Sequence, residues 1–293
     1  MQTMRYVCLL VVCTSGLVLA GATGDDDLAS VVAKGDVKCL ELWDGFRRFV
    51  AEELDVQRVF DKSGKVRRVR RIRSDYYIVR LPSARPDDPD AVLEFRDVLE
   101  VDGKPVRRNP ARLMALLTVK GASLREESCR LHAASNEHNL FGSGWQINFT
   151  ASIAGYIHKV PDLQTTYRLA PEMAGSNDEA VVCFEETGTH TRMGEGSCVA
   201  PQPLPGAGCI HMTKGDYDIL SGEVTVTLKT LPVRMRVLVE YRAGPGGLRV
   251  PARRVMSILN AKWRDGVVVQ AEATYSNFRR FSAESTVSFE PIR

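Results

Sequence analysis

Apolar and polar residues alternate most regularly in the last third of the chain. Four long segments there are predicted to be strands, because nearly every second residue is apolar; they cover 221–230, 233–243, 248–261 and 266–281. In the first segment Val224 and Val226 share one face, while Thr225 and Thr227 share the other. Glycine-containing turns separate the later segments, so we expect an antiparallel meander.

The first part of the chain predicts a helix followed by strands. Cys39, Trp43, Phe46 and Val50 are spaced for one face of a helix, and Gly35 is a candidate break within it. Three strands are then predicted at 54–60, 66–82 and 91–106. A tight hairpin at 61–65 and a turn at 102–103 connect them.

Helical patterns return in the middle of the chain. After Asn109-Pro110 we expect helices within 111–119 and 123–140, and a short helix at 149–157. Two further strands are predicted at 165–171 and 179–187. There is no internal repeat in the sequence, so the order of strands, helices and strands predicts one α+β domain.

The N-terminus has the form of a secretory signal peptide. Arg5 precedes an apolar run that ends at the small residues Ala20-Gly21-Ala22, which predicts cleavage after residue 22. The alternative is an uncleaved membrane anchor. We therefore expect an exported protein whose single domain covers 23–293, in the periplasm or associated with the outer membrane.

Seven cysteines are present, and five follow the predicted cleavage site: Cys39, Cys129, Cys183, Cys198 and Cys209. An odd number in an oxidising compartment allows at most two internal disulfides. Cys198 and Cys209 flank a loop rich in proline and glycine, so they are the expected pair. No C-x-x-C spacing occurs, and no metal site is predicted.

One strand is unusually basic. The stretch "VRRVRRIRSDYYIVRLP", residues 66–82, holds five arginines within its first eight positions. We favour a structural interpretation, in which they pair with Glu94, Asp97 and Glu100 and oppose edge-to-edge aggregation. In the alternative, Arg68 and Arg70 form a basic rim that meets lipid phosphates or an anionic membrane surface.

Other classes of partner and chemistry have little support. The net charge of +3 is small for a nucleic-acid-binding protein. Neither H-E-x-x-H nor G-x-S-x-G occurs in the sequence. Glu185 and Glu186 adjoin on a predicted strand and would face opposite sides. No catalytic residue and no cofactor are predicted.

Three segments carry a family resemblance: "RRIRSDYYIVRLP", "FRDVLEVDGKPVR" and "ATYSNFRRF", in this order. They resemble a family of largely uncharacterised secreted bacterial proteins whose architecture is similar to the periplasmic lipoprotein carrier (LolA/LolB-like) fold. The resemblance spans roughly 37–281. It implies a strongly curved antiparallel sheet, an incomplete β-barrel, with helices covering the concave face. It implies no catalytic residues.

Such a fold would leave an apolar cavity between sheet and helices. Each methylene buried there contributes about 0.8 kcal/mol, so roughly ten would suffice for useful binding. The candidate lining residues, for each of which plain core packing is the simpler interpretation, are Trp43, Phe46, Leu113, Leu116, Leu117, Val237, Val239 and Val268. The leading hypothesis is a non-catalytic protein that binds a lipid, a lipoprotein acyl chain or another hydrophobic ligand. The alternatives are a structural or interaction module of the cell envelope with a self-filled cavity and, third, a hydrolase.

Overall fold

The computed structural model of the protein describes most of the chain. The described residues are 27–46, 49–81, 91–107, 123–142, 150–160, 163–196, 201–229, 231–260, 266–283 and 287–291. The predicted signal peptide and the predicted helix within 111–119 therefore lie outside them.

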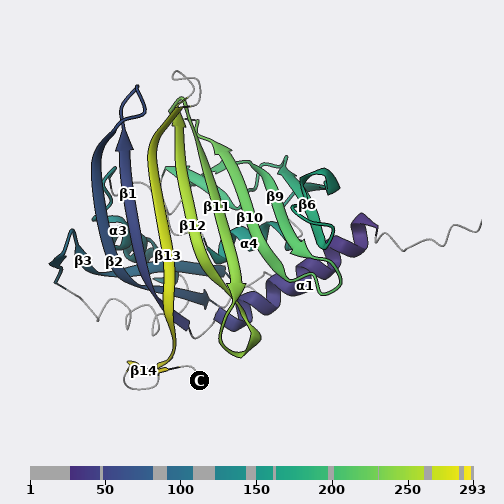
Figure 1. Ribbon diagram of the computed structural model, residues 1–293, viewed down its shortest axis with the longest axis horizontal. Coiled ribbons are helices and arrows are strands. Elements are labelled where there is room, and N and C mark those ends of the chain that lie inside the picture. The colour runs from purple at the N-terminus through teal and green to yellow at the C-terminus, as the bar shows by residue number, and fades with distance from the viewer. Residues whose placement is uncertain are drawn as a thin grey trace, which may run out of the picture.

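A twelve-stranded antiparallel sheet dominates the structure (Figure 1). Neighbouring strands follow the order β4-β3-β2-β1-β13-β12-β11-β10-β9-β6-β5, and β14 pairs with β13. Among the described residues the end strands β4 and β5 do not pair with each other, so the sheet stays open. The strands are β1 (Phe49–Phe60), β2 (Val66–Leu81), β3 (Ala91–Val101), β4 (Lys104–Pro105), β5 (Thr165–Leu169), β6 (Glu179–Glu186), β9 (Gly206–Thr213), β10 (Ile219–Thr227), β11 (Val233–Ala243), β12 (Arg249–Asn260), β13 (Gly266–Ala283) and β14 (Val287–Pro291). A separate hairpin pairs β7 (Met193–Gly196) with β8 (Pro201–Leu204).

Helices are few in the described part of the chain. They are α1 (Leu28–Phe46), α3 (Ser123–Asn136) and α4 (Ala151–Ala154), with short 3-10 turns η1 (Gly155–Ile157), η2 (Pro171–Met173) and η3 (Pro245–Gly247). α1 contacts β2, β6 and β10, α4 contacts β3 and β10, and α3 contacts β3. None of the helices in the described ranges is long and apolar enough to cross a membrane.

The alternating pattern predicted the meander well. Strands β10 to β13 occupy the four predicted segments, and β5 and β6 occupy the two predicted before them. Strand β9 was not predicted, because its residues follow directly on the region rich in proline and glycine. It nevertheless pairs with β6 on one side and β10 on the other.

The N-terminal boundary differs from the prediction. Helix α1 ends at Phe46, and β1 begins at Phe49 rather than at residue 54. Val50 therefore does not continue the helical face: it pairs with Tyr77 of β2 and Arg279 of β13. Its apolar character fits a helix face and a buried strand equally well, so spacing alone could not decide between them.

Gly35 does not break α1. An added Cβ at this position would lie 2.7 Å from Cγ1 of Ile157 and 2.9 Å from Sδ of Met212. The glycine therefore allows α1 to approach η1 and β9 closely. A second close approach occurs at Gly222 of β10, where an added Cβ would lie 2.7 Å from Cγ2 of Ile153 in α4.

Both predicted turns are present. Asp102 and Gly103 have φ angles of +50° and +80° between β3 and β4, and Gly64 has a φ of +78° in the β1–β2 connection. These left-handed conformations suit tight hairpins. Asp102 and Gly103 therefore reverse the direction of the chain at the position where the Asp-Gly pair predicted a turn.

The expected disulfide between Cys198 and Cys209 is wrong, because Cys209 is bonded to Cys183 instead. These two residues face each other directly in the pairing of β6 with β9, with Cα atoms 3.9 Å apart. Cys129 is also disulfide-bonded, whereas Cys39 is a buried free thiol. The error has the same origin as the missed strand, since the pairing is evident only once β9 is recognised.

Removing the Cys183–Cys209 disulfide should destabilise the protein markedly. Its 26-residue separation corresponds to about 3.5 kcal/mol of lost chain entropy in the unfolded state. We expect denaturant titration to give a free energy of unfolding for the Cys183→Ala/Cys209→Ala variant that is lower than the wild-type value by this amount. Peptide mapping without reduction should recover Cys183 linked to Cys209. A Cys198–Cys209 peptide instead would contradict the assigned pairing.

Candidate functional site

The face of the sheet that contacts α1 and α4 has an extended aliphatic surface on β10 to β13. Residues of these strands are buried there mostly in alternation, and the apolar ones among them belong to one hydrophobic cluster. The members on these strands include Val224, Val226, Met235, Val237, Val239, Met256, Ile258, Val269, Ala271 and Ala273. We call this set the aliphatic surface.

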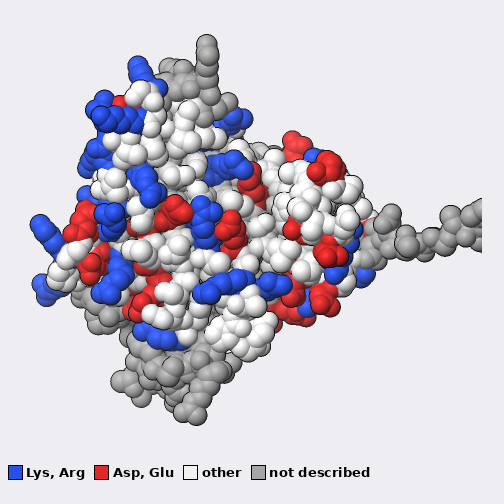
Figure 2. Space-filling model, in the orientation of Figure 1, with Lys and Arg blue, Asp and Glu red and all other residues white. Residues whose placement is uncertain are grey.

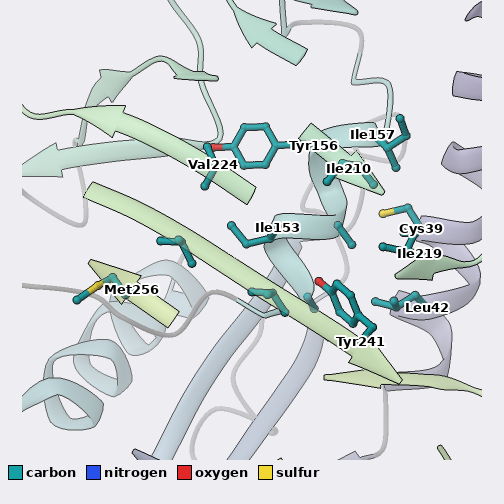
Figure 3. Packing of buried hydrophobic residues seen from close by; sticks show 14 of the residues in the cluster. Cys39, Leu42, Ile153, Tyr156, Ile157, Ile210, Ile219, Val224, Tyr241 and Met256 are labelled. Atoms are coloured by element: carbon teal, nitrogen blue, oxygen red, sulfur yellow. The ribbon is translucent and has the colours of Figure 1, made fainter. Parts of the chain in front are cut away.

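Helix α1 and the α4–η1 segment pack against the same cluster (Figure 3). Ile153 and Tyr156 contribute from α4–η1, and Cys39 and Leu42 contribute from α1. The Tyr156 ring stacks on Phe184 of β6 with centroids 4.4 Å apart. Burial raises the pKa of the Cys39 thiol, so this residue is a neutral, apolar part of the packing.

The predicted lining residues fall into different environments. Phe46, Val237 and Val239 are buried in the cluster. Trp43 is partly buried and donates its indole N–H to the carbonyl of Ala151 at 3.0 Å. Val268 is also partly buried and packs against the cluster, at a pairing irregularity between β12 and β13. Leu113, Leu116 and Leu117 lie outside the described residues.

Beside the aliphatic surface, the same face of the sheet carries charged residues on β1. Glu53, Asp55 and Gln57 are all 0% exposed, whereas Leu54 between them is 46% exposed. The sequence pattern would place Leu54 inside and the acids outside. The structure inverts this choice: the acids lie on the inner side of the sheet and Leu54 lies on the outer side.

Two buried arginines are these partners. Arg96 of β3 lies 2.8 Å from Oδ2 of Asp55 and 3.6 Å from Oε2 of Glu53. Arg254 of β12 lies 3.6 Å from Oε1 of Glu53 and 3.5 Å from Oδ1 of Asp55. All four side chains are 0% exposed, and their two positive and two negative charges cancel. We call these four residues the ion core.

A small residue makes this arrangement possible. Ala273 of β13 pairs with Asp55 on one side and with Arg254 on the other. Its methyl group leaves room for the guanidinium to cross β13 and reach the acids of β1. Tyr275 donates its hydroxyl to Glu53 at 3.1 Å. Burial raises the pKa of Tyr275 well above its ordinary value, so it remains a donor.

The ion core continues into the segment after α3. Gln57 donates to Oδ1 of Asn139 at 3.0 Å, and its own Oε1 accepts the backbone N–H of Leu140 at 2.7 Å. Arg96 donates to the carbonyl of Ser135 at 2.8 Å and also to Asn139. Arg70, predicted as part of a basic rim, donates to the carbonyl of His138 at 2.7 Å. The polar side chains of β1–β3 therefore fix this segment to the sheet.

Glu94 is a second buried anion, on the same strand as Arg96. It was predicted to pair with the arginines of β2, but its carboxylate holds the start of α4 instead. It accepts the backbone N–H groups of Thr150 at 2.5 Å, Ala151 at 3.1 Å and Ser152 at 2.7 Å. The hydroxyls of Tyr76, Thr150 and Ser152 also donate to it. Glu94 thus satisfies the first N–H groups of a helix that belongs to another part of the chain.

The opposite face of the sheet pairs its charges in solvent. Arg253 of β12 lies 3.3 Å from Glu240 of β11 and 2.8 Å from Glu272 of β13. Glu272 in turn lies 3.5 Å from Arg58 of β1. Figure 2 shows basic and acidic side chains interspersed on this face.

No group of His, Cys, Asp and Glu in the described ranges could hold a metal ion.

The adjacent residues Arg254 and Arg253 offer a direct test of the ion core. We expect Arg254→Ala to lower the free energy of unfolding by about 3–5 kcal/mol, because it leaves Glu53 and Asp55 with too little buried positive charge. Arg253→Ala should cost at most about 1 kcal/mol, since its partners are exposed to solvent. Urea denaturation of both variants measures the difference. Equal losses would show that the buried pairs have no special weight.

No protein-family model and no curated protein match the sequence. Two solved structures are similar to the chain at low identity. One is a DUF1329 family protein from Desulfovibrio piger, with 12% identity, 87% of this chain and 95% of that chain covered, and a TM-score of 0.40. The other is a LolA superfamily protein from Nitrosomonas europaea, with 11% identity, 87% and 94% covered, and a TM-score of 0.37. At these identities and TM-scores, the function of this chain has to be inferred from its own residues.

Proposed function

We propose that the protein is a non-catalytic binder of a hydrophobic ligand, such as a lipid or a lipoprotein acyl chain. The ligand would lie between the aliphatic surface and the helices. In this proposal the sheet is an incomplete barrel whose concave face the helices cover. Residues 23–293 form one domain after removal of the signal peptide, in the periplasm or at the outer membrane.

The observation that carries this proposal is the composition of the aliphatic surface. It combines branched side chains with the flexible Met235 and Met256 and the small Ala271. Methionine adapts to ligands of varied shape, and the alanine leaves width for a chain to lie across the strands. At about 0.8 kcal/mol per methylene, such a surface can retain an acyl chain.

The buried carboxylates of the ion core are poorly placed for catalysis. Glu53 and Asp55 are 0% exposed and each is held by both arginines of the ion core. A hydrolase needs a carboxylate or nucleophile that reaches its substrate. These carboxylates instead anchor the strands against one another.

A specific observation also favours the second candidate, a structural or interaction module with a self-filled interior. Val237 and Val239 are 0% exposed, and Ile153 packs tightly on Gly222. The two candidates differ in one respect: a ligand binder must separate α4 from β10 to admit its ligand.

A reversible crosslink tests this separation. An added Cβ at Gly222 would lie 3.9 Å from Cβ of Ile153, within the usual range for a disulfide. We expect the oxidised Ile153→Cys/Gly222→Cys variant to lose uptake of a fluorescent fatty acid and to regain it on reduction. Fluorescence titration of the purified full chain measures uptake in both states.

Two controls accompany this experiment. Wild-type protein receives the same reductant, because the native disulfides are exposed to it as well, and the Ile153→Cys single variant reports the effect of the substitution alone. Mass spectrometry of an organic-solvent extract should find stoichiometric lipid on protein purified from cells. A lipid-free extract together with no uptake by the wild type would support the self-filled module. Undiminished uptake by the crosslinked variant would rule out a site beneath α4.

A further inference from the structure

The β1–β2 hairpin concentrates positive charge at one end of the molecule. Its connection projects beyond the ends of the neighbouring strands, at the top left of the view (Figure 1). Residues 58–73 contain a single acid, Asp61, and eight basic residues: Arg58, Lys62, Lys65, Arg67, Arg68, Arg70, Arg71 and Arg73.

Four of these eight basic side chains form ion pairs with acids of the protein. Arg67 lies 2.6 Å from Asp61, and Arg73 lies 3.5 Å from Glu100, as predicted for the following strand. Arg58 pairs with Glu272 at 3.5 Å and Arg70 with Asp102 at 3.7 Å. Structural pairing therefore explains four of the eight basic residues.

The other four, Lys62, Lys65, Arg68 and Arg71, are exposed and form no ion pair with an acid of the described ranges. Two apolar side chains lie among them: Val66 is 40% exposed and Val69 is 44% exposed. Because side chains alternate along a strand, Val69 and Arg71 lie on one face of the hairpin, and Arg68 lies on the other. We call these six residues the hairpin patch.

The connection that carries the patch is ordered by its own hydrogen bonds. Oδ1 of Asp61 accepts the N–H of Ser63 at 2.9 Å, its hydroxyl at 2.6 Å and the N–H of Lys65 at 3.0 Å. The hydrogen bonds from Ser63, those from the backbone and nearby Arg67 lower the pKa of Asp61 to about 2. The turn therefore keeps this geometry at neutral pH, and its lysines are presented with little ordering cost on binding.

We propose that the hairpin patch docks the protein onto an anionic membrane surface. This inference goes beyond the proposed function, because it assigns a surface separate from the interior and holds whatever the interior contains. Lysine and arginine meet lipid phosphates, while Val66 and Val69 enter the headgroup region. Base stacking requires exposed aromatic rings, whereas Tyr76 and Tyr77 on this strand are each only 1% exposed. The aliphatic groups thus favour a lipid surface over a nucleic acid.

The test compares the purified full chain on two kinds of vesicle. One kind consists of phosphatidylcholine alone, and the other also contains phosphatidylglycerol. We expect sedimentation with the anionic vesicles only, weakened by salt. Each basic residue near such a surface contributes on the order of fivefold to binding, so Lys62→Gln/Lys65→Gln should weaken it by roughly 25-fold. The matched control, Lys159→Gln/Lys214→Gln, removes two exposed lysines elsewhere and should bind like the wild type.

A second variant separates a membrane from other polyanions. Val66→Ser/Val69→Ser keeps every charge and should weaken vesicle binding several-fold while leaving any binding to single-stranded DNA unchanged. Loss of binding to DNA but not to vesicles in the lysine variant would overturn the proposal in favour of a nucleic acid. Equal vesicle binding by the hairpin and control variants would also overturn it. Fatty-acid uptake should be the same in all these variants, so the outcome is independent of the proposed ligand.

Discussion

The structure depends on charge burial across the centre of the sheet. Glu53 and Asp55 on β1 face inward, and the fold is consistent only because Arg96 and Arg254 reach them from β3 and β12. Removing two charges from water is costly, and only good geometry with further hydrogen bonds offsets this cost. Ala273, Tyr275 and Gln57 supply that geometry. The ion core therefore selects a single register for these strands, because a shift by one residue would expose the acids and bury Leu54.

The interior consequently has two chemically different parts. The aliphatic surface of β10–β13 is held by apolar contacts, which depend little on the orientation of the side chains. Its packing can therefore adapt to small shifts of the elements that cover it. The β1–β3 side holds α4 and the segment after α3 by hydrogen bonds from Glu94, Arg96 and Gln57. This division is the physical basis of the proposal that a hydrophobic ligand lies beneath α4.

Much of the fold could be predicted from the sequence, but the polar interior could not. Strands β10–β13 alternate clearly because one side faces the core and the other faces solvent, and the Asp-Gly turn has a strong local signal. Val50 and Cys209 were misassigned because their partners, on β2, β13 and β6, are distant in the sequence. The alternation Glu53, Asp55, Gln57 also marks one face of a strand, but nothing local shows that this face is buried. Arg73 of β2 pairs with Glu100 as predicted, whereas the location of Glu94 beneath α4 was evident only in three dimensions.

The order of the strands has a consequence for synthesis. β1 lies beside β13, so Glu53 meets Tyr275 across 222 positions of the chain. Such distant pairings form slowly, and an incomplete chain risks aggregation while it waits for them. Before β12 and β13 are available, Glu53 and Asp55 lack Arg254 and Tyr275 as partners. The ion core is therefore complete only when nearly the whole chain has been made.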